Sequence, residues 1–145
     1  MAIFVFKPTA MKTAQLIYYL DDDIDDLYFF KEIVEGMGHT ATIFVNGKEL
    51  LKALSSKEEA IPDIIFLDIH MPVFNGEEIL QVIRKTEGLA DVPIVMISGD
   101  YPKKLMAHYL DAGASYMMKK TQLSDLEVNL EQVLNIDWRN FQAFN

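Results

Sequence analysis

The chain has 145 residues, half of them hydrophobic and 24% charged, a composition typical of a single globular domain. Its formal net charge of -9 argues against nucleic acid and anionic membranes as partners. The chain contains no cysteine, which excludes disulfides, thiolate metal sites and cysteine nucleophiles and fits a reducing, cytoplasmic location.

Residues 1–14 are predicted to form a leader before the folded domain. The apolar patch at residues 3–6 lacks the basic start and long apolar stretch of a signal peptide, and Pro8 interrupts the segment that follows it. No apolar run reaches the ~18 residues that a membrane-spanning helix needs. The leader is expected to be loosely ordered, with an extra strand or a contact surface as the alternative.

Strand-like and helix-like segments alternate from Gln15 onward. Short apolar runs predict strands at residues 16–20, 40–45, 63–68, 94–98 and 116–119. Apolar residues at helical spacing predict helices at residues 25–37, 46–54, 79–83, 103–111 and 124–134. Ser124-x-x-Glu127 is expected to be the capping box of the last helix. The domain is therefore placed at residues 15–135.

Residues 136–145 form a predicted C-terminal tail that carries aromatic side chains. We expect these aromatic groups to pack back on the domain, and the alternative is contact with a partner or a second copy. Because the chain stops near its last predicted helix, no attached output domain is expected.

The alternation of apolar strands and helices predicts an α/β fold, in which helices cover both faces of a parallel sheet. Ligands of such open sheets bind at the carboxyl ends of the strands. The residues that end each strand are therefore the candidates for a site. They are Asp21, Asp22 and Asp23 after the first strand, Asp68 after the third, Ser98 after the fourth, and Lys119 or Lys120 after the fifth.

Together these side chains suit phosphoryl transfer to an aspartate. Crowded carboxylates repel one another, and a divalent cation relieves the repulsion without protonation. Ligand sets made only of oxygen favour magnesium, calcium or manganese. An aspartate is a known nucleophile toward phosphorus, and a cation and a lysine can neutralise the transferred group.

Each of these residues taken alone also has a purely structural interpretation. The acidic run at residues 21–23 can cap the following helix, and Asp68 can be a turn residue. Ser98 before a glycine is a common exit from a strand, and His70 is compatible with an ordinary loop. The functional hypothesis therefore depends on the combination, in which every member stands at a strand end.

Four segments resemble the receiver domains of two-component response regulators of the CheY type: LIYYLDDDIDD, PDIIFLDIHMPVFNGEEIL, VPIVMISGD and DAGASYMMKK. They and the pattern between them cover residues 15–134, and the stretch with Asp68, Met71, Pro72 and Gly76 is the most specific. The resemblance implies a doubly wound, flavodoxin-like parallel sheet of five strands in the order 2-1-3-4-5. It also implies a magnesium-dependent signalling switch that assists its own phosphorylation and dephosphorylation but is not otherwise an enzyme.

The resemblance also implies a role for each site residue. Asp68 would accept the phosphoryl group, and Ser98 would be the switch hydroxyl. Asp22 would bind Mg²⁺ directly together with Asp68. Asp21 would act on the ion through water, and His70 would contribute its backbone carbonyl.

The chain departs from the family pattern at the lysine, because Lys119 and Lys120 are followed by Thr121 where the family has proline. Counting without gaps from Gly113 selects Lys120, but it places Lys119 at an apolar core position, which is costly. One deletion before Tyr116 aligns the chain with the family order aromatic, apolar, apolar, lysine. We therefore favour Lys119 as the site lysine, with Lys120 as the alternative, and Tyr116 as the aromatic switch residue.

A receiver domain implies a histidine kinase or a phosphotransfer protein as the phosphoryl donor. Output would then pass through protein contacts to a downstream protein that the sequence does not identify, or through a phosphorelay. The domain itself is expected to be a monomer or a weak dimer.

Three other interpretations remain open from the residues. A haloacid-dehalogenase-type phosphatase would use Asp21 as nucleophile and Asp23 as acid, but it leaves Asp68 unexplained. An EF-hand would use the oxygens of Asp21, Asp23, Asp25 and Glu32, although the segment before them is strand-like. A degenerate receiver would act only as a binding module.

Overall fold

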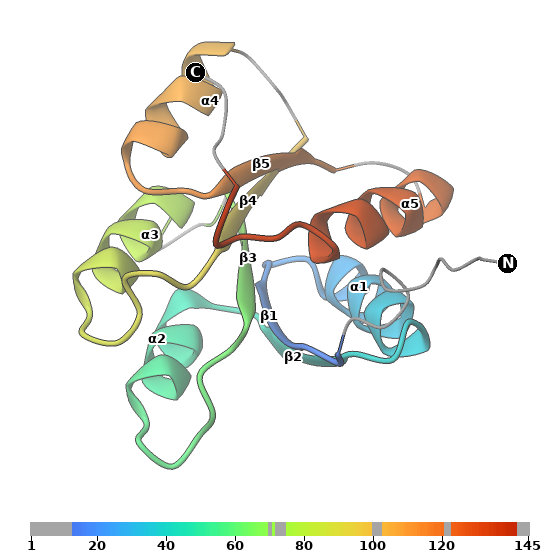
Figure 1. Cartoon of the computed structure of the whole chain (residues 1–145), viewed down its shortest axis with the longest axis horizontal. Coiled ribbons are helices and arrows are strands. Elements are labelled where there is room, and N and C mark those ends of the chain that lie inside the picture. Colours follow the sequence, from blue (N-terminus) through green and yellow to red (C-terminus); the bar gives the residue numbers. More distant parts are fainter. Residues whose placement is uncertain (1–12, 70, 72–74, 100–102, 121–122, 142–145) are drawn as a thin grey trace, which may run out of the picture.

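A computed structural model describes residues 13–69, 71, 75–99, 103–120 and 123–141. Five parallel strands form one sheet in the order β2-β1-β3-β4-β5, as predicted (Figure 1). The strands are β1 (Leu16–Leu20), β2 (Thr40–Phe44), β3 (Ile64–Asp68), β4 (Ile94–Ser98) and β5 (Tyr116–Lys119). The helices are α1 (Ile24–Gly36), α2 (Gly47–Ser55), α3 (Gly76–Lys85), α4 (Lys103–Asp111) and α5 (Leu123–Leu134).

Helices cover both faces of the sheet, with α1 and α5 on one face and α2, α3 and α4 on the other (Figure 1). Each face has its own apolar core, because successive side chains of a strand point to opposite sides. Along β1, Tyr18 and Leu20 belong to the core under α2 to α4, whereas Ile17 and Tyr19 belong to the core under α1 and α5. The central strand β3 and its neighbour β4 are buried along their whole length.

Two capping groups set where the helices near the site begin. The side chain of Asp23 accepts hydrogen bonds from the backbone N–H groups of Asp25 and Asp26, so α1 starts directly after the acidic run. Asn75 and Glu78 form a capping box at the start of α3. The capping box expected at Ser124 is wrong, because α5 begins at Leu123 and Ser124 already lies inside its first turn.

The tail from residue 136 to residue 141 packs on the domain, which is the interpretation that the sequence favoured. Trp138 lies against the core under α1 and α5. Its ring centroid is 6.3 Å from that of Tyr116 and 5.2 Å from that of Phe141.

None of the helices in the described part of the chain is both long and apolar enough to span a membrane. Residues 1–12 of the expected leader lie outside the described residues.

Candidate functional site

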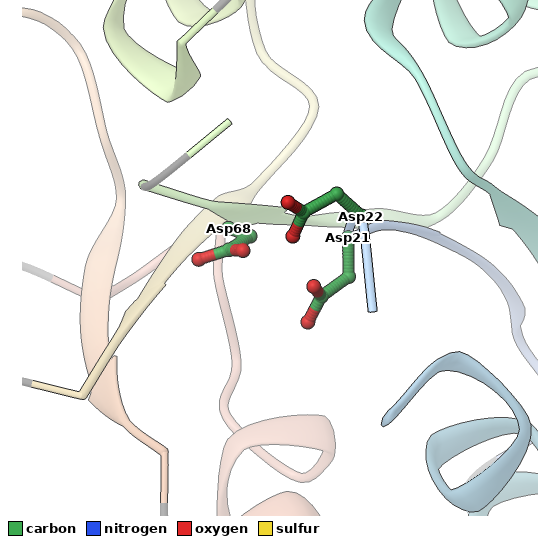
Figure 2. A group of neighbouring side chains, drawn as sticks. All are labelled: Asp21, Asp22 and Asp68. Atoms are coloured by element: carbon green, nitrogen blue, oxygen red, sulfur yellow. The ribbon is translucent and has the colours of Figure 1, made fainter. Parts of the chain in front are cut away.

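Three carboxylates meet at the carboxyl ends of two neighbouring strands. Asp21 and Asp22 directly follow β1, and Asp68 ends β3 (Figure 2). One carboxylate oxygen from each of them lies within 4.8 Å of the others. Asp21 is fully buried and Asp68 is 4% exposed, whereas Asp22 is open to solvent. The arrangement can hold a hard cation through oxygen ligands and leaves Asp22 on the side from which an ion would enter.

Asp21 is held in place by three donors. The hydroxyl of Tyr19 and the ammonium of Lys120 both donate to its Oδ2, and the backbone N–H of Asp23 donates to its Oδ1 at 2.9 Å. Burial raises the pKa of Asp21, but the hydrogen bonds from Lys120, Tyr19 and Asp23 together hold that pKa below its usual value. Asp21 therefore stays ionised although it is buried.

Tyr19 supplies one of these hydrogen bonds from inside the sheet. Its ring is only 3% exposed and packs against Phe30, with ring centroids 4.3 Å apart. Burial, followed by the adjacent charge of Asp21, raises the pKa of the Tyr19 hydroxyl far above its ordinary value. The hydroxyl thus remains a donor and keeps the carboxylate of Asp21 in one orientation.

The lysine at the site is Lys120, which corrects the preference for Lys119. The Nζ of Lys120 lies 2.8 Å from Asp21 Oδ2, 3.0 Å from Asp26 Oδ2 and 3.7 Å from Asp68 Oδ2. Burial lowers the pKa of Lys120, but hydrogen bonds to Asp21 and Asp26 more than offset this, so the pKa lies above its usual value. The ammonium is therefore charged at neutral pH.

The argument for Lys119 was wrong, because choosing Lys120 does not bury the charged side chain of Lys119 in the apolar core. Met117 and Met118 are buried in opposite cores, but Lys119 stands at the end of β5 and its side chain is exposed. Lys119 therefore faces solvent rather than the apolar interior. The backbone N–H of Lys120 donates to the carbonyl of Ser98 at 2.7 Å, which holds Lys120 beside the end of β4.

Tyr116, the predicted aromatic switch residue, lies with the tail rather than with the site. Its strand partner is Val95, three residues before Ser98. Its ring centroid is 5.9 Å from that of Phe141. In the register that selects Lys120, the position three residues before the lysine is Met117, which is buried in the core under α2 to α4. The chain thus has methionine where the family pattern has an aromatic residue.

The remaining predicted site residues have different outcomes. Ser98 ends β4 and is fully buried beside the end of β5. His70 and Pro72 lie outside the described residues.

The EF-hand interpretation is wrong, because the acidic run follows a strand instead of a helix. In the phosphatase interpretation Asp21 would be the nucleophile, but its carboxylate is buried and already accepts three hydrogen bonds.

Two residues beside the acidic cluster carry little signal of a site in the sequence. Tyr19 belongs to an apolar run typical of a strand, although its position two residues before Asp21 places both on one face. Asp26 stands in the first turn of a helix, where acidic residues are common in any protein. Only the contact between α1 and the end of β5 reveals that Asp26 pairs with Lys120.

The start of α3 approaches the backbone of Asp68 so closely that only glycine fits at position 76. A Cβ on Gly76 would lie 2.8 Å from the carbonyl oxygen of Asp68 and 3.1 Å from the Cα of Ile69. Both atoms belong to the backbone and cannot move aside without shifting the site. This contact explains the glycine in the most specific segment of the sequence.

We expect Gly76→Ala to lower the free energy of unfolding by about 1–3 kcal/mol, because the added methyl group overpacks the region beside Asp68. Gly36→Ala is a matched control in α1, since a Cβ there would meet nothing within 4 Å. Urea unfolding followed by circular dichroism measures both. A loss in Gly76→Ala no larger than that in Gly36→Ala would contradict the steric explanation.

Comparisons with known proteins agree on one family. The family model of the response regulator receiver domain matches residues 17–131 of the chain. The chain is 28% identical over 120 residues to the DNA-binding transcriptional regulator NtrC of Escherichia coli. It is 31% identical over 123 residues to the transcriptional regulatory protein PrrA of Mycobacterium tuberculosis. The matches cover 83% and 84% of this chain, but only 25% of NtrC and 51% of PrrA.

Solved structures show the same fold. The phosphorylated cyanobacterial phytochrome response regulator RcpA has a TM-score of 0.74 at 20% identity, over 90% of this chain and 98% of its own. The Mn²⁺-bound form of the response regulator Rcp1 has a TM-score of 0.74 at 17% identity, over 90% of this chain and 99% of its own.

Proposed function

Because the chain belongs to the response regulator receiver domain family, we propose that Asp68 is the residue that accepts the phosphoryl group. The observation that carries this proposal is the position of Asp68 at the end of the central strand β3, close to both the acidic pair and the ammonium of Lys120. A carboxylate oxygen of Asp68 forms a bond to phosphorus as the donor's P–N bond breaks. The departing imidazole nitrogen of the donor keeps the electron pair of that bond.

The same site is proposed to bind Mg²⁺, which would neutralise charge on the phosphoryl oxygens. The donor set of Asp21, Asp22 and Asp68 fits a hard divalent cation. Asp22 and Asp68 would hold the ion directly with the backbone carbonyl of His70, and Asp21 would act through water. A divalent cation is bound by the similarly folded Rcp1, in its Mn²⁺-bound form.

The protein side chains supply the rest of the chemistry. Lys120 places a positive charge beside the oxygens that the phosphoryl group brings to Asp68. Asp21 fixes Lys120 and is itself fixed by Tyr19. Ser98 is proposed to donate its hydroxyl to a phosphoryl oxygen and so to report phosphorylation to the neighbouring end of β5.

The proposed phosphoryl donor is a histidine kinase or a phosphotransfer protein in the cytoplasm. We propose residues 15–135 as the switching domain, residues 1–14 as a leader and residues 136–145 as a tail. The domain would act as a monomer or weak dimer, without nucleic acid or membrane as a partner. It would assist its own phosphorylation and dephosphorylation rather than turn over another substrate, and it would signal through protein contacts or a phosphorelay.

The direct test is labelling by a small phosphodonor. Incubate the chain with acetyl phosphate or phosphoramidate and Mg²⁺, and locate the added mass by peptide mapping. One phosphoryl group per chain, on the peptide that contains Asp68, is the expected result. Label on Asp21 would instead support the phosphatase interpretation, and label on neither residue would refute the proposed chemistry.

The proposed magnesium site gives a separate expectation. Asp22→Ala should weaken Mg²⁺ binding by about tenfold or more, because it removes a direct ligand from the most accessible position of the site. Backbone amide shifts near Asp68 report the titration. Asp25→Ala, which removes an equal charge from the nearby exposed start of α1, serves as the control. Equal affinities of the two variants would count against Asp22 as a ligand.

A further inference from the structure

We propose that Asp26 is a positioning residue that shares the ammonium of Lys120 with Asp21 and thereby holds it back from Asp68. The inference rests on the proposed function of Asp68. It adds a regulatory role for a residue of α1 that contributes no oxygen to the three-carboxylate cluster. In this arrangement, the strength of one ion pair sets how readily the lysine moves to the phosphoryl group.

The distances around the ammonium are unequal. Nζ of Lys120 is within hydrogen-bond distance of Asp21 and Asp26, at 2.8 and 3.0 Å, but lies 3.7 Å from Oδ2 of Asp68. An ammonium has three N–H donors, and two of them are used by these carboxylates. The positive charge is thus already paired twice before any phosphoryl group arrives.

The start of α1 explains why Asp26 reaches the lysine. Asp23 caps the helix, and its side chain binds the N–H groups of both Asp25 and Asp26. Residues four apart lie on one helix face, so Asp26 shares the face of Phe30, which is buried against the sheet. Asp25 is exposed. The helix therefore directs one of two adjacent acidic residues toward the end of β5.

The two partners of the lysine differ in how firmly they are held. Asp21 is fully buried and tied to Tyr19 and to the backbone of Asp23. The side chain of Asp26 is 39% exposed, and that of Lys120 is 32% exposed. Water competes with a half-exposed ion pair, so this contact is the weaker of the two and the one that can exchange. A phosphoryl group on Asp68 would compete with Asp26 for the N–H group of Lys120 that Asp26 binds.

The pair Asp25 and Asp26 offers a matched experiment. Asp26→Asn and Asp25→Asn each remove one negative charge from the first turn of α1, but only Asp26→Asn releases Lys120. Acetyl phosphate with Mg²⁺ is the donor, varied in concentration to separate KM from the rate constant at saturation. We expect the two variants to change KM alike, since both lose the same long-range charge.

The rate constant at saturation should differ between them. We expect it to be about two- to fivefold higher in Asp26→Asn than in Asp25→Asn, the factor that one half-exposed ion pair can supply. Asp26→Glu, which restores the carboxylate, should return the rate to that of the parent chain. In a Lys120→Met background, Asp26→Asn and Asp25→Asn should behave alike, because the lysine that couples Asp26 to Asp68 is gone.

Failure of this inference is separable from failure of the proposed function. If Asp26→Asn is no faster than Asp25→Asn while label still maps to Asp68, the role of Asp26 is refuted and the function stands. A difference that persists without Lys120 also refutes the inference. Label that maps elsewhere refutes the function itself. Circular dichroism and urea unfolding of each variant establish that the compared chains are folded, and Asp26→Glu provides a second variant at the position.

Discussion

Asp68→Asn should abolish phosphoryl incorporation, with at least a ~100-fold loss of label, because an amide lacks the nucleophilic carboxylate oxygen. The substitution preserves shape and removes one of three crowded negative charges. The folded state should therefore keep its stability or gain some, since the repulsion between like charges falls. Label incorporation and urea unfolding, measured on the same sample, separate loss of chemistry from loss of fold.

Asp63→Asn is the matched control for this experiment. Asp63 stands at the opposite end of β3, where its carboxylate accepts a hydrogen bond from the backbone N–H of Leu16 at 2.7 Å. Asparagine can still accept this bond through its side-chain oxygen, so Asp63→Asn should label like the parent chain. Full labelling of Asp68→Asn would show that another residue accepts the phosphoryl group.

Lys120→Ala should slow phosphoryl transfer by about 10²–10³-fold, the usual cost of removing one group that stabilises charge in a transition state. Lys119→Ala should behave nearly like the parent chain, because the side chain of Lys119 is exposed. The measurement is the labelling rate of both variants with one donor at one Mg²⁺ concentration. The adjacent lysine is an ideal control, since both substitutions remove the same group from consecutive positions.

Stability must be followed in the same experiment. Lys120→Ala leaves Asp21 fully buried with its Tyr19 and backbone donors but without its cation. Removing one partner of a buried pair is costly, so the variant should also unfold at lower urea concentration. The rate comparison is therefore made at a temperature where both variants are folded. A slow Lys119→Ala beside a normal Lys120→Ala would reverse the assignment.

The strands themselves and the position of the acidic site followed from the sequence, because both depend on strong local signals, whereas the order of the strands was implied only by the resemblance to receiver domains. Each strand is a short run rich in apolar or β-branched residues, and each site residue stands at the end of a strand or just after it. Asp68 is the clearest example, since it ends the fully buried strand β3. Parallel packing then brings strand ends together at one edge, so the site required no knowledge of long-range contacts.

Which lysine lies at the site could not be predicted, because the answer depends on long-range contacts that the sequence pattern does not contain. Two adjacent lysines at the end of a strand differ only in which one faces solvent, and that depends on where β5 leaves the sheet. Burial of both Met117 and Met118 left the apolar pattern unable to choose. The capping box was misplaced for a related reason, since Ser124 fits the motif but α5 begins one residue earlier.

The acidic cluster links cation binding to folding. Asp21 and Asp68 belong to strands that are distant in the chain and meet only because β1 pairs with β3. The unfolded chain therefore has no comparable binding site, and any ion held by these carboxylates draws the folding equilibrium toward the native state. Without the ion, the fold carries the repulsion of its own acidic groups, which only Lys120 offsets among the ion pairs of the described residues. If the proposed function holds, the same residues that would prepare the chain for phosphorylation should also make its stability depend on the divalent cation concentration around it.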